Sequence, residues 1–460
     1  MILEQANIIL PRDIISLLNK LEESGYEAYV VGGAVRDSLL ERTINDYDIT
    51  TNATPDEICE VFKDYQIIPT GLQHGTVTVV IDKNSYEITT YRSESGYTDG
   101  RHPDGVKFIK SLEEDLSRRD FTINALACDV RGNVIDYHSG IEDLRNKVIR
   151  CVGDPDTRFE EDYLRILRAV RFSAQLSFVI ESNTAISMIK NRLGLYKISK
   201  ERIRVELNKM MRAPDSKFLC DLLKQFKLIM LTIIPELDPT VAPINEISHH
   251  DKSIYNHLCN VVGNIETPDY LLRMAAFLHD IGKPATMNYD AKKQRITFYE
   301  HDIKGAEIAY NILRRLRYTK EEIEEIVLLI RYHNDPTKID IRWVRRKLNR
   351  FEGNEARLRK LFILKLADVR DHKYFKTWQF SKYNQLNALV DQIIKEDQCF
   401  SLKKMAVNGY DMIELGFKGK EIGAMLDILL RLVIDEKLEN CRPELLAYAL
   451  KRKKGLLKLK

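Results

Sequence analysis

The sequence of 460 residues has few cysteines and no long run of apolar residues. Its seven cysteines lie far apart without a Cys-x-x-Cys pair, which argues against zinc knuckles or a disulfide framework and favours reduced thiols in the cytoplasm. No apolar run approaches the length of a membrane span, and the N-terminal stretch MILEQANIILPRD lacks a long apolar core. We therefore expect neither a membrane segment nor a signal peptide. The net charge of only +3 means that any nucleic-acid surface must be a local patch.

The pattern along the chain changes from mixed to helical. Residues 1–140 combine a predicted helix over 11–24, a buried strand in EAYVVGG and a hairpin of TVTVVID with SYEITTYR around Lys83-Asn84. From residue 158 strand patterns nearly vanish, and Arg158–Leu176 shows a helical period. We therefore predict an α/β head with a mixed or antiparallel sheet, followed by an all-α remainder. The predicted domains are a head (1–140), a neck (141–210), a body (211–400) and a tail (401–460).

The most informative pattern is VGGAVRDSLLERTINDYDIT at residues 31–50. Gly32 and Gly33 open an expected helix, where backbone amides and the helix dipole favour an anion. Asp46 and Asp48 follow at an expected strand and share a face, because side chains alternate along a strand. Paired carboxylates repel unless a cation lies between them, and Mg²⁺ takes such ligands together with substrate phosphates. The pattern predicts nucleotidyl transfer; a turn followed by solvated aspartates is the simpler alternative.

Further charged side chains could complete this site. Arg36 falls on the first turn after the glycines, where it would meet a triphosphate or form a surface salt bridge. Glu87, on a neighbouring expected strand, is either a third carboxylate or an exposed strand residue. The segment Arg118-Arg119-Asp120, followed by Asn124, combines guanidinium forks for phosphate with a carboxylate that can accept a hydrogen bond from a ribose hydroxyl. Taken alone, this segment would more simply be a helix cap with flanking charge.

The segment EDYLR, residues 161–165, has the spacing of a base-reading pair. On an expected helix, residues three apart share a face, so Asp162 and Arg165 can approach one flat ligand together. Cytosine and adenine both present an amino donor beside a ring-nitrogen acceptor, whereas uracil and guanine reverse part of that pattern. The pair therefore suits the selection of CTP and ATP without a nucleic-acid template, unless it is a surface ion pair of small energy. Arg168, one turn further, would support the nucleotide or its phosphates.

These motifs together resemble one family. GGAVRD, DYDITTNATPDE, GLQHGTVTVV, YEITTYR, YTDGRHPDGVKF, RRDFTINALA and RFEEDYLRILRAVRF resemble, in order and spacing, the head and neck of class II tRNA nucleotidyltransferases. This family comprises the CCA-adding enzymes and their bacterial poly(A) polymerase relatives. The resemblance implies a polymerase-β-like head that uses Mg²⁺. It further implies that Asp46 and Asp48 are metal ligands and that Arg119 and Asp120 contact the phosphates and sugar of the NTP. Asp162 and Arg165 are implied to read the base.

Two segments depart from the family pattern, and one loop bears on the product. Tyr137-His138-Ser139 stands where a proline-containing turn is common, and Tyr163 replaces a smaller residue or proline, which affects the expected local geometry only. The stretch 93–105, with Arg101 and Asp104, is predicted to be a mobile loop. Relatives that add only the two C residues tend to lack this loop, so its presence favours the addition of A as well.

The helical remainder carries a second signature of histidine and aspartate. His257 is followed by His279-Asp280 in FLHDIGKP and by Asp368 in LKLADVRDHK, a series that resembles the HD phosphohydrolase superfamily. The resemblance implies these four residues as ligands of a divalent ion, and imidazole with carboxylate suits a transition metal. The same stretch holds a candidate second metal position and a candidate phosphate contact: His301, His333 and Lys283. The alternatives are histidines placed in helices by chance, and a domain kept as a scaffold without hydrolytic activity.

The motifs together with the family resemblance imply stepwise addition of C, C and A to the 3′ end of tRNA from CTP and ATP, by a two-metal mechanism that releases pyrophosphate. Two alternatives stay open. The chain could be an A-adding enzyme or poly(A) polymerase, or it could be chiefly a nucleotide phosphohydrolase with a head that binds RNA. Selectivity for tRNA is expected from shape and phosphate contacts along the helical part. The segment 408–423 and the basic end 451–460 resemble the tail with which the family grips tRNA.

Overall fold

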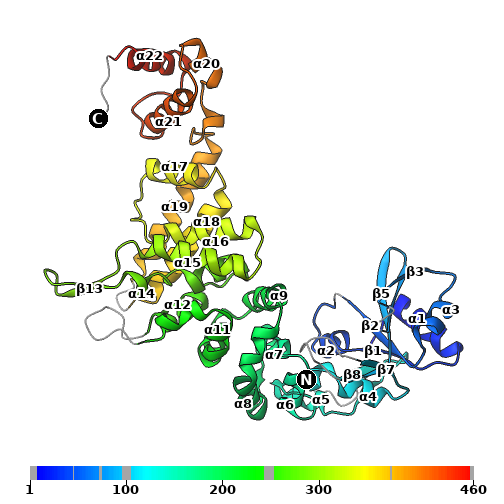
Figure 1. The fold of residues 1–460 in the computed structure, drawn as a ribbon. Coiled ribbons are helices and arrows are strands. Elements are labelled where there is room, and N and C mark those ends of the chain that lie inside the picture. Colours follow the sequence, from blue (N-terminus) through cyan, green and yellow to red (C-terminus); the bar gives the residue numbers. More distant parts are fainter. Residues whose placement is uncertain are drawn as a thin grey trace. The chain divides into compact units, whose positions relative to one another are not determined.

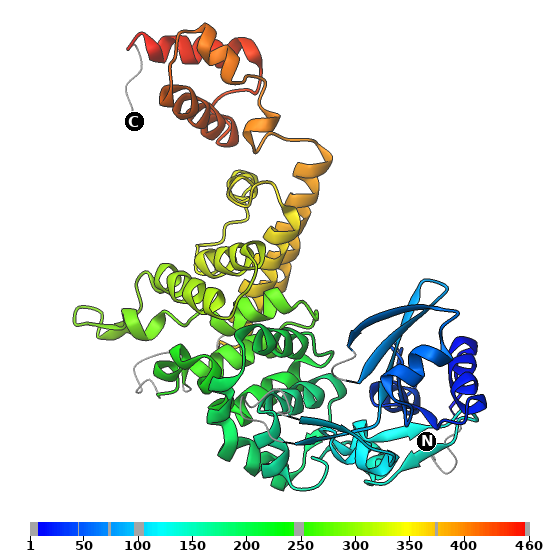
Figure 2. The same cartoon turned by 45° about the vertical axis from the view of Figure 1, so that its right-hand side comes forward.

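The computed structural model describes residues 8–44, 46–71, 75–95, 105–242, 253–372 and 376–455. These residues form two compact units (Figures 1 and 2). The first contains the chain up to Asp238, with Glu266–Tyr270 and Ile312–Tyr318, and the second contains Pro239–Ile265, Leu271–Asn311 and Thr319 onward. Among the helices described, none combines the length and the apolar character needed to cross a membrane.

A seven-stranded mixed sheet organises the head, with the strand order β3-β4-β5-β2-β1-β8-β9. Only β2 and β5 pair in parallel within this sheet, and the other neighbours are antiparallel. The strands are β1 (Ala28–Val31), β2 (Asp48–Thr51), β3 (Gln66–Gly71), β4 (Thr76–Ile81), β5 (Asn84–Thr90), β8 (Leu126–Cys128) and β9 (Val134–Asp136). A separate pair joins β6 (Arg92–Ser95) to β7 (Gly105–Phe108). The mixed sheet confirms the predicted fold class of the head.

Local sequence explains why these strands and turns form. The β4–β5 hairpin turns at Asp82 and Lys83, whose φ values of 47° and 71° are those of a type I′ turn, one residue earlier than predicted. Alternate residues of β4, Val77 and Val79, are fully buried, as the period of a half-buried strand requires. Helix α1 (Arg12–Glu23) confirms the predicted first helix.

The first unit contains further helices, between the strands of the head and after them. They are α2 (Gly33–Leu39), α3 (Pro55–Val61), α4 (Leu112–Ser117), α5 (Gly140–Asn146), α6 (Pro155–Glu161), α7 (Leu164–Leu176), α8 (Ser182–Asn191), α9 (Lys200–Met211), α10 (Ser216–Gln225) and α11 (Lys227–Ile233). The short 3-10 helix η2 spans Thr122–Asn124. In Figure 1, α7, α8, α9 and α11 follow one another in green.

The helical period over Arg158–Leu176 belongs to two helices, so the expectation that Asp162 and Arg165 lie on one helix is wrong. Helix α6 ends at Glu161, Asp162 is extended with φ −145° and ψ 102°, and α7 begins at Leu164. Oδ1 of Asp162 accepts a hydrogen bond from the backbone N–H of Leu164 at 3.0 Å. A short acidic side chain that accepts a hydrogen bond from a nearby backbone N–H is more favourable at a helix end than inside a helix. Asp162 therefore separates two helices.

The second unit is built almost entirely of helices. They include α12 (Ile254–Gly263), α14 (Lys283–Thr286), α16 (Lys320–Tyr332), α17 (Ile341–Arg350), α18 (Glu355–Arg370), α19 (Trp378–Lys395), α20 (Gly409–Glu414), α21 (Lys420–Ile434) and α22 (Arg442–Lys453), and parts of α13 (Tyr270–Leu278) and α15 (His301–Arg315). The last three helices share an apolar core that includes Met412, Leu429 and Leu445, and Figure 2 shows them in orange and red.

Two short strand pairs interrupt the predicted all-α part. β10 (Val148–Ile149) pairs in parallel with β11 (Val179–Ile180) in the neck, and β12 (Asn288–Asp290) pairs with β13 (Arg295–Thr297) in the body. These strands have two or three residues, too few for an alternating pattern to be recognised in the sequence. The body is otherwise helical, as predicted.

Candidate functional site

Acidic side chains of the head meet at the start of β2. Asp48 is the first residue of this strand and stands opposite Glu87 in the parallel pairing of β2 with β5, so both side chains lie on one face of the sheet. Asp46 precedes the strand by two residues. Partial burial raises the pKa of Asp48; the Arg119 guanidinium lowers it, and the Asp46 carboxylate raises it further. The structure therefore brings the two predicted metal ligands and the predicted third carboxylate together.

Gly32 allows an arginine to approach the backbone at the start of α2. Its φ of +74° lies in the region that favours glycine. A Cβ atom at this position would lie 3.0 Å from a terminal nitrogen of Arg119, which is tighter than normal packing. Gly33, by contrast, has room for a Cβ atom, 3.7 Å from the Arg36 guanidinium. The conformational requirement therefore falls on the first glycine of the predicted pair.

A chain of hydrogen bonds links four of the predicted nucleotide-binding residues. Arg36 donates to Oδ1 of Asn124 at 2.7 Å, and Asn124 donates through Nδ2 to Oδ1 of Asp120 at 3.0 Å. Nε of Arg168 donates to Oδ2 of Asp120 at 2.7 Å. Burial raises the pKa of Asp120, but Arg168 and Asn124 outweigh it and bring the pKa down to about 2. Asp120 is therefore an ionised, buried carboxylate that orients groups on both sides.

Asp115 on α4 is a residue that the sequence reasoning missed. It is fully buried and accepts hydrogen bonds from Nε and Nη2 of Arg118 at 3.0 and 2.8 Å, and Nη2 of Arg119 lies 3.5 Å away. Burial raises the pKa of Asp115, whereas Arg118 and Arg119 lower it and prevail. Asp115 lies three and four residues before these arginines, a helical spacing that was the available signal.

Asp162 and Arg165 lie near one another in the chain, but each has its own counter-ion. Arg202 on α9 forms an ion pair with Oδ2 of Asp162 at 2.6 Å. Arg165 donates to Oε2 of Glu161 at 2.6 Å and to the carbonyl oxygen of Arg118 at 2.9 Å. Among the residues that the structure describes, no ion pair joins Asp162 to Arg165. Arg202 was missed because it lies 40 residues from Asp162, beyond any local spacing.

The unusual Tyr163 is accommodated by a glycine. A Cβ atom on Gly194 would lie 2.0 Å from Cδ1 of Tyr163, so the ring packs directly against the backbone there. Nζ of Lys197 lies 5.3 Å from the centre of the same ring. The predicted loop residues Arg101 and Asp104 lie outside the described residues, as do Lys458 and Lys460 of the basic end.

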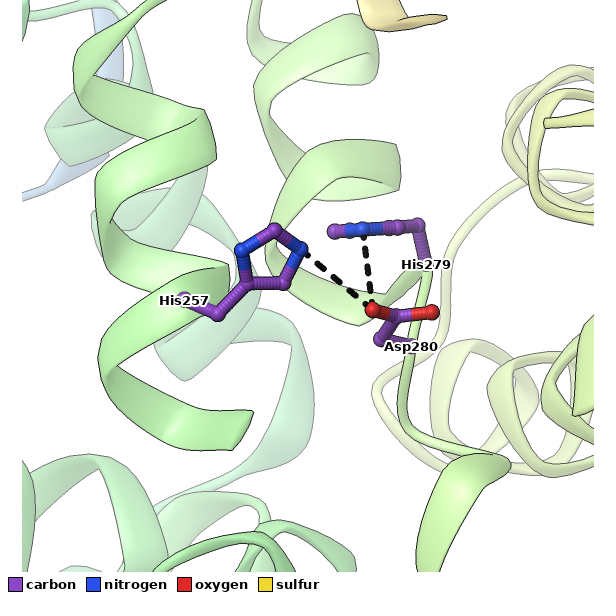
Figure 3. A group of neighbouring side chains, drawn as sticks. All are labelled: His257, His279 and Asp280. Atoms are coloured by element: carbon purple, nitrogen blue, oxygen red, sulfur yellow. Dashed lines mark ion pairs between the residues drawn. The ribbon is translucent and has the colours of Figure 1, made fainter. Parts of the chain in front are cut away.

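Histidines and aspartates gather in the second unit, around Asp280. His257 comes from α12, and His279 and Asp280 directly follow α13. Figure 3 shows both imidazoles turned towards the Asp280 carboxylate, with Nε2 of each ring 3.4 Å from Oδ2. Oδ1 of Asp368, on α18, lies 3.1 Å from Nε2 of His257 and 3.8 Å from Nε2 of His279. The four residues that the HD resemblance implied are therefore neighbours.

The other oxygen of Asp280 faces a second pair of histidines. Its Oδ1 lies 3.3 Å from Nε2 of His301 and 3.4 Å from Nε2 of His333, and these two nitrogens are 3.3 Å apart. Nζ of Lys283 lies 2.5 Å from Oδ2 of Asp280. Asp280 is thus placed between two histidine pairs that approach it from opposite oxygens.

Each histidine is oriented by an acceptor at Nδ1. For His279, His301 and His333 this acceptor is a backbone carbonyl oxygen, of Ala276, Phe298 and Ile330, at 2.7, 2.7 and 2.6 Å. For His257 it is Oδ2 of Asp371, at 2.8 Å, and Asn260 donates to the other oxygen of Asp371. A carbonyl oxygen can only accept, so Nδ1 carries the proton and the lone pair of a neutral ring is at Nε2. Metal-binding histidines have this arrangement.

The burial of these groups fits a bound cation. Nε2 of His279 and Oδ1 of Asp280 are buried and make no hydrogen bond within the described part of the chain. Such atoms are costly unless a partner satisfies them. Burial lowers the pKa of His279, but the carboxylates of Asp280 and Asp368 raise it to about 9, so this cluster attracts positive charge. The ligand atoms of His257, His279 and Asp280 lie within 4.8 Å of one another, as do those of Asp280, His301 and His333.

Asp371 and His372 were not predicted as site residues. Asp371 orients His257, and Nε2 of His372 lies 3.4 Å from Oδ1 of Asp368. Both lie in the segment DVRDHK, which begins with Asp368. They follow Asp368 by three and four residues, the spacing that places side chains on one face at the end of α18. That spacing was the signal that could have identified them.

Comparison with known families assigns three parts of the chain. The family described as "Poly A polymerase head domain" matches residues 28–150, and "HD domain" matches residues 253–372. A third family, "Probable RNA and SrmB- binding site of polymerase A", matches residues 177–240, between them. These matches confirm the family resemblance predicted from the sequence, including the HD domain.

Individual relatives agree with the family matches. The CCA-adding enzyme of Lactobacillus helveticus is 50% identical over 231 residues, which are 50% of this chain and 56% of that protein. The chain thus spans about half the length of the curated relatives it matches. A crystal structure of the Bacillus stearothermophilus CCA-adding enzyme in complex with CTP is 27% identical, with a TM-score of 0.72 over 97% of this chain and 99% of that one. The Thermotoga maritima CCA-adding enzyme complexed with tRNA, at 19% identity and a TM-score of 0.59, shares the fold over 98% of this chain and 97% of that one.

Proposed function

We propose that this chain, whose residues 28–150 belong to the poly A polymerase head domain family, adds C, C and A stepwise to the 3′ end of tRNA from CTP and ATP. The observation that carries the proposal is the meeting of Asp46, Asp48 and Glu87 at the start of β2, with Arg119 next to Asp48. A carboxylate cluster beside an arginine is what a metal-dependent phosphoryl transfer needs. The CTP complex of the similar Bacillus stearothermophilus enzyme supports CTP as a substrate.

In this proposal the terminal 3′ oxygen of the tRNA attacks the α-phosphorus of the nucleotide, the bond to the β-phosphate oxygen breaks, and pyrophosphate leaves. Asp46 and Asp48 would hold Mg²⁺, which when bound favours ionisation of the 3′ hydroxyl and neutralises the charge on the phosphates. The proton of the hydroxyl passes to solvent. Arg36 and Arg119 bind and orient the triphosphate, and Asp120 fixes the Arg36–Asn124 arrangement through its hydrogen bond to Asn124.

The base-reading role of Asp162 and Arg165 rests on their separate counter-ions. Because neither side chain neutralises the other, the Asp162 carboxylate can accept from an exocyclic amino group while Arg165 donates to a ring nitrogen. Cytosine and adenine offer that combination. The names of the similar proteins also favour CCA addition over an A-adding enzyme or poly(A) polymerase.

The activity is tested with purified full-length protein and a tRNA transcript that ends at the discriminator base. CTP alone should extend this tRNA by two nucleotides, and subsequent ATP by one. Asp48→Ala should abolish both extensions, and circular dichroism checks that this variant still folds. Extension by A without prior C would identify an A-adding enzyme instead, and no incorporation at all would refute nucleotide transfer.

We further propose that the HD site binds divalent metal and hydrolyses phosphate esters. The position of Asp280 between two histidine pairs supports this, since His257, His279, Asp280 and Asp368 suit one transition-metal ion and Asp280, His301 and His333 suit a second. Lys283 could bind a substrate phosphate near these ions. The test measures bound metal by mass spectrometry and hydrolysis of a cyclic nucleotide, with Asp280→Ala expected to remove both and to spare nucleotide addition. Metal binding without hydrolysis would leave a structural centre.

RNA contact along the helical part is proposed from the match over residues 177–240 and from the basic C-terminal helix. Not every basic residue of α22 is available for phosphate. Nζ of Lys453 donates to the carbonyl oxygen of Leu415 at 2.5 Å at the end of α20, and lies 5.4 Å from the ring of Phe417. We therefore assign tRNA contact to Lys451 and Arg452 in preference to Lys453. The proposed location of the protein is the cytoplasm.

A further inference from the structure

Arg202 on α9 is a charged side chain that the proposed mechanism does not yet use. Its Nη2 donates to Oδ2 of Asp162 at 2.6 Å, and its Nη1 donates to Oδ1 at 3.4 Å. The side chains of Arg202 and Asp162 are only 26% and 17% exposed. A guanidinium that engages both oxygens of a carboxylate fixes the plane of that carboxylate as well as its position.

Helix α9 holds Arg202 in a fixed place relative to α7. Glu206 lies four residues after Arg202, on the same face of α9, and forms an ion pair with Arg171 of α7 at 2.8 Å. Both members of that pair are buried, and Arg171 lies 3.8 Å from the centre of the Phe172 ring. Arg202 and Glu206, one turn apart on α9, thus attach this helix to Asp162 and to α7, which gives a rigid support for a side chain that orients another.

Arg165 is the partner that Asp162 would otherwise reach. It lies only three residues further along the chain, a separation at which a carboxylate and a guanidinium can form an ion pair. Arg202 occupies Asp162, and Glu161 occupies Arg165 at 2.6 Å. The two groups that would read a base are therefore kept apart, each still carrying unused hydrogen-bonding positions, since a carboxylate can accept about four hydrogen bonds and a guanidinium can donate five.

We propose that Arg202 is a positioning residue that sets nucleotide selectivity by holding Asp162 away from Arg165; this rests on the proposed addition of C and A. Without Arg202, Asp162 turns to Arg165, and both lose the orientation that fits cytosine and adenine. The acceptor for the exocyclic amino group is then absent from its place. Uracil and guanine, which present a carbonyl oxygen there, are no longer rejected by a fixed negative charge.

The experiment compares four full-length proteins: wild type, Arg202→Ala, Arg202→Lys and the control Arg204→Ala. Arg204 lies on the same helix but faces away from Asp162 and donates to the carbonyl oxygen of Arg317. For each protein, kcat/KM is measured for CTP and UTP on tRNA lacking its three terminal nucleotides, and for ATP and GTP on tRNA ending in CC. The informative quantity is the ratio of kcat/KM between correct and incorrect nucleotide, because partial unfolding reduces both values equally and leaves the ratio unchanged.

Arg202→Ala should lower kcat/KM for CTP and ATP by about 10²-fold, as misplacement of an orienting group does, and the selectivity ratios should fall at least about tenfold. Arg202→Lys should recover part of the ratio, because lysine keeps the charge without the planar fork. Arg204→Ala should retain the wild-type ratios. If the selectivity ratios of both Arg202 variants equal those of wild type, the proposal is wrong. If Arg202→Ala does not fold, Arg202→Gln replaces it in this comparison. Wild type that adds neither C nor A would overturn the proposed function itself.

Discussion

Replacement of Asp120 by asparagine should weaken the first unit without affecting the second. Asp120 is 7% exposed, and its pKa falls from 3.8 to about 2, so its ionisation contributes about 2 kcal/mol to the free energy of unfolding at neutral pH. Asparagine keeps the size and the hydrogen bond to Asn124 but removes the charge that holds Arg168. We therefore expect Asp120→Asn to lower the free energy of unfolding of this unit by about 2 kcal/mol.

The two tryptophans allow the units to be followed separately. Trp343 and Trp378 are the only tryptophans of the chain, and both belong to the second unit. In urea, far-ultraviolet circular dichroism reports both units, whereas tryptophan fluorescence reports the second. Asp120→Asn should shift the circular dichroism curve and leave the fluorescence midpoint unchanged. A double-mutant cycle with Arg168→Ala should give a coupling energy of about 1–2 kcal/mol, reduced because Arg168 is partly exposed.

The pH dependence of stability independently tests whether ionised Asp120 stabilises the first unit. The pKa of Asp120 is lower in the folded state than in the unfolded state, so its contribution is complete above the unfolded value near 3.8 and disappears as the pH falls through about 2. The difference in stability between wild type and Asp120→Asn should therefore shrink between pH 4 and pH 2. An equal shift of both spectroscopic transitions, or a difference that does not change over this range, would refute the assigned role of Asp120.

Three further outcomes follow from particular contacts. Gly32→Ala should lower the free energy of unfolding by about 1–3 kcal/mol, because the φ of +74° is unfavourable for alanine, and should displace Arg119. Gly33→Ala should have a smaller effect on both stability and activity. Thermal unfolding measures the stability and nucleotide addition the displacement, and equal results for the two variants would contradict the geometry. Asp371→Asn should weaken metal binding about 10–100-fold by releasing His257, as measured by competition with a chelator, and unchanged affinity would exclude this support. Cys128 and Cys151, whose pKa burial raises to about 12, should not react with a thiol reagent at pH 8 in the folded protein, while Cys441 should; rapid modification of all seven cysteines would show that the buried ones open readily.

The sequence was sufficient for features that depend on neighbours in the chain. The first helix, the β4–β5 hairpin and the mixed sheet of the head follow from local periods and turn residues, and the structure confirms them. Helix boundaries were less predictable where a side chain competes with the backbone, as the break at Asp162 shows. The apolar period continues across that break, so period alone could not reveal it.

Contacts between distant helices could not be predicted from spacing. Arg202 pairs with Asp162 only because α9 packs against α7, which depends on the buried Arg171–Glu206 pair and on the path of the chain between these helices. The histidine series of the HD domain was identified through family resemblance, and the structure adds which atoms face one another. His257 and His279 face one oxygen of Asp280, and His301 and His333 face the other. This division depends on side-chain rotamers, which the sequence pattern does not predict.

The position of Asp162 at the end of one helix and the start of the next limits how nucleotide preference can change in evolution. A replacement at this position must also supply an oxygen close to the backbone to begin α7, a condition that Asp, Asn, Ser and Thr meet and larger or apolar residues do not. Variants with altered preference are therefore expected to arise first among these four residues, or by changes at Arg202 that leave the start of α7 intact.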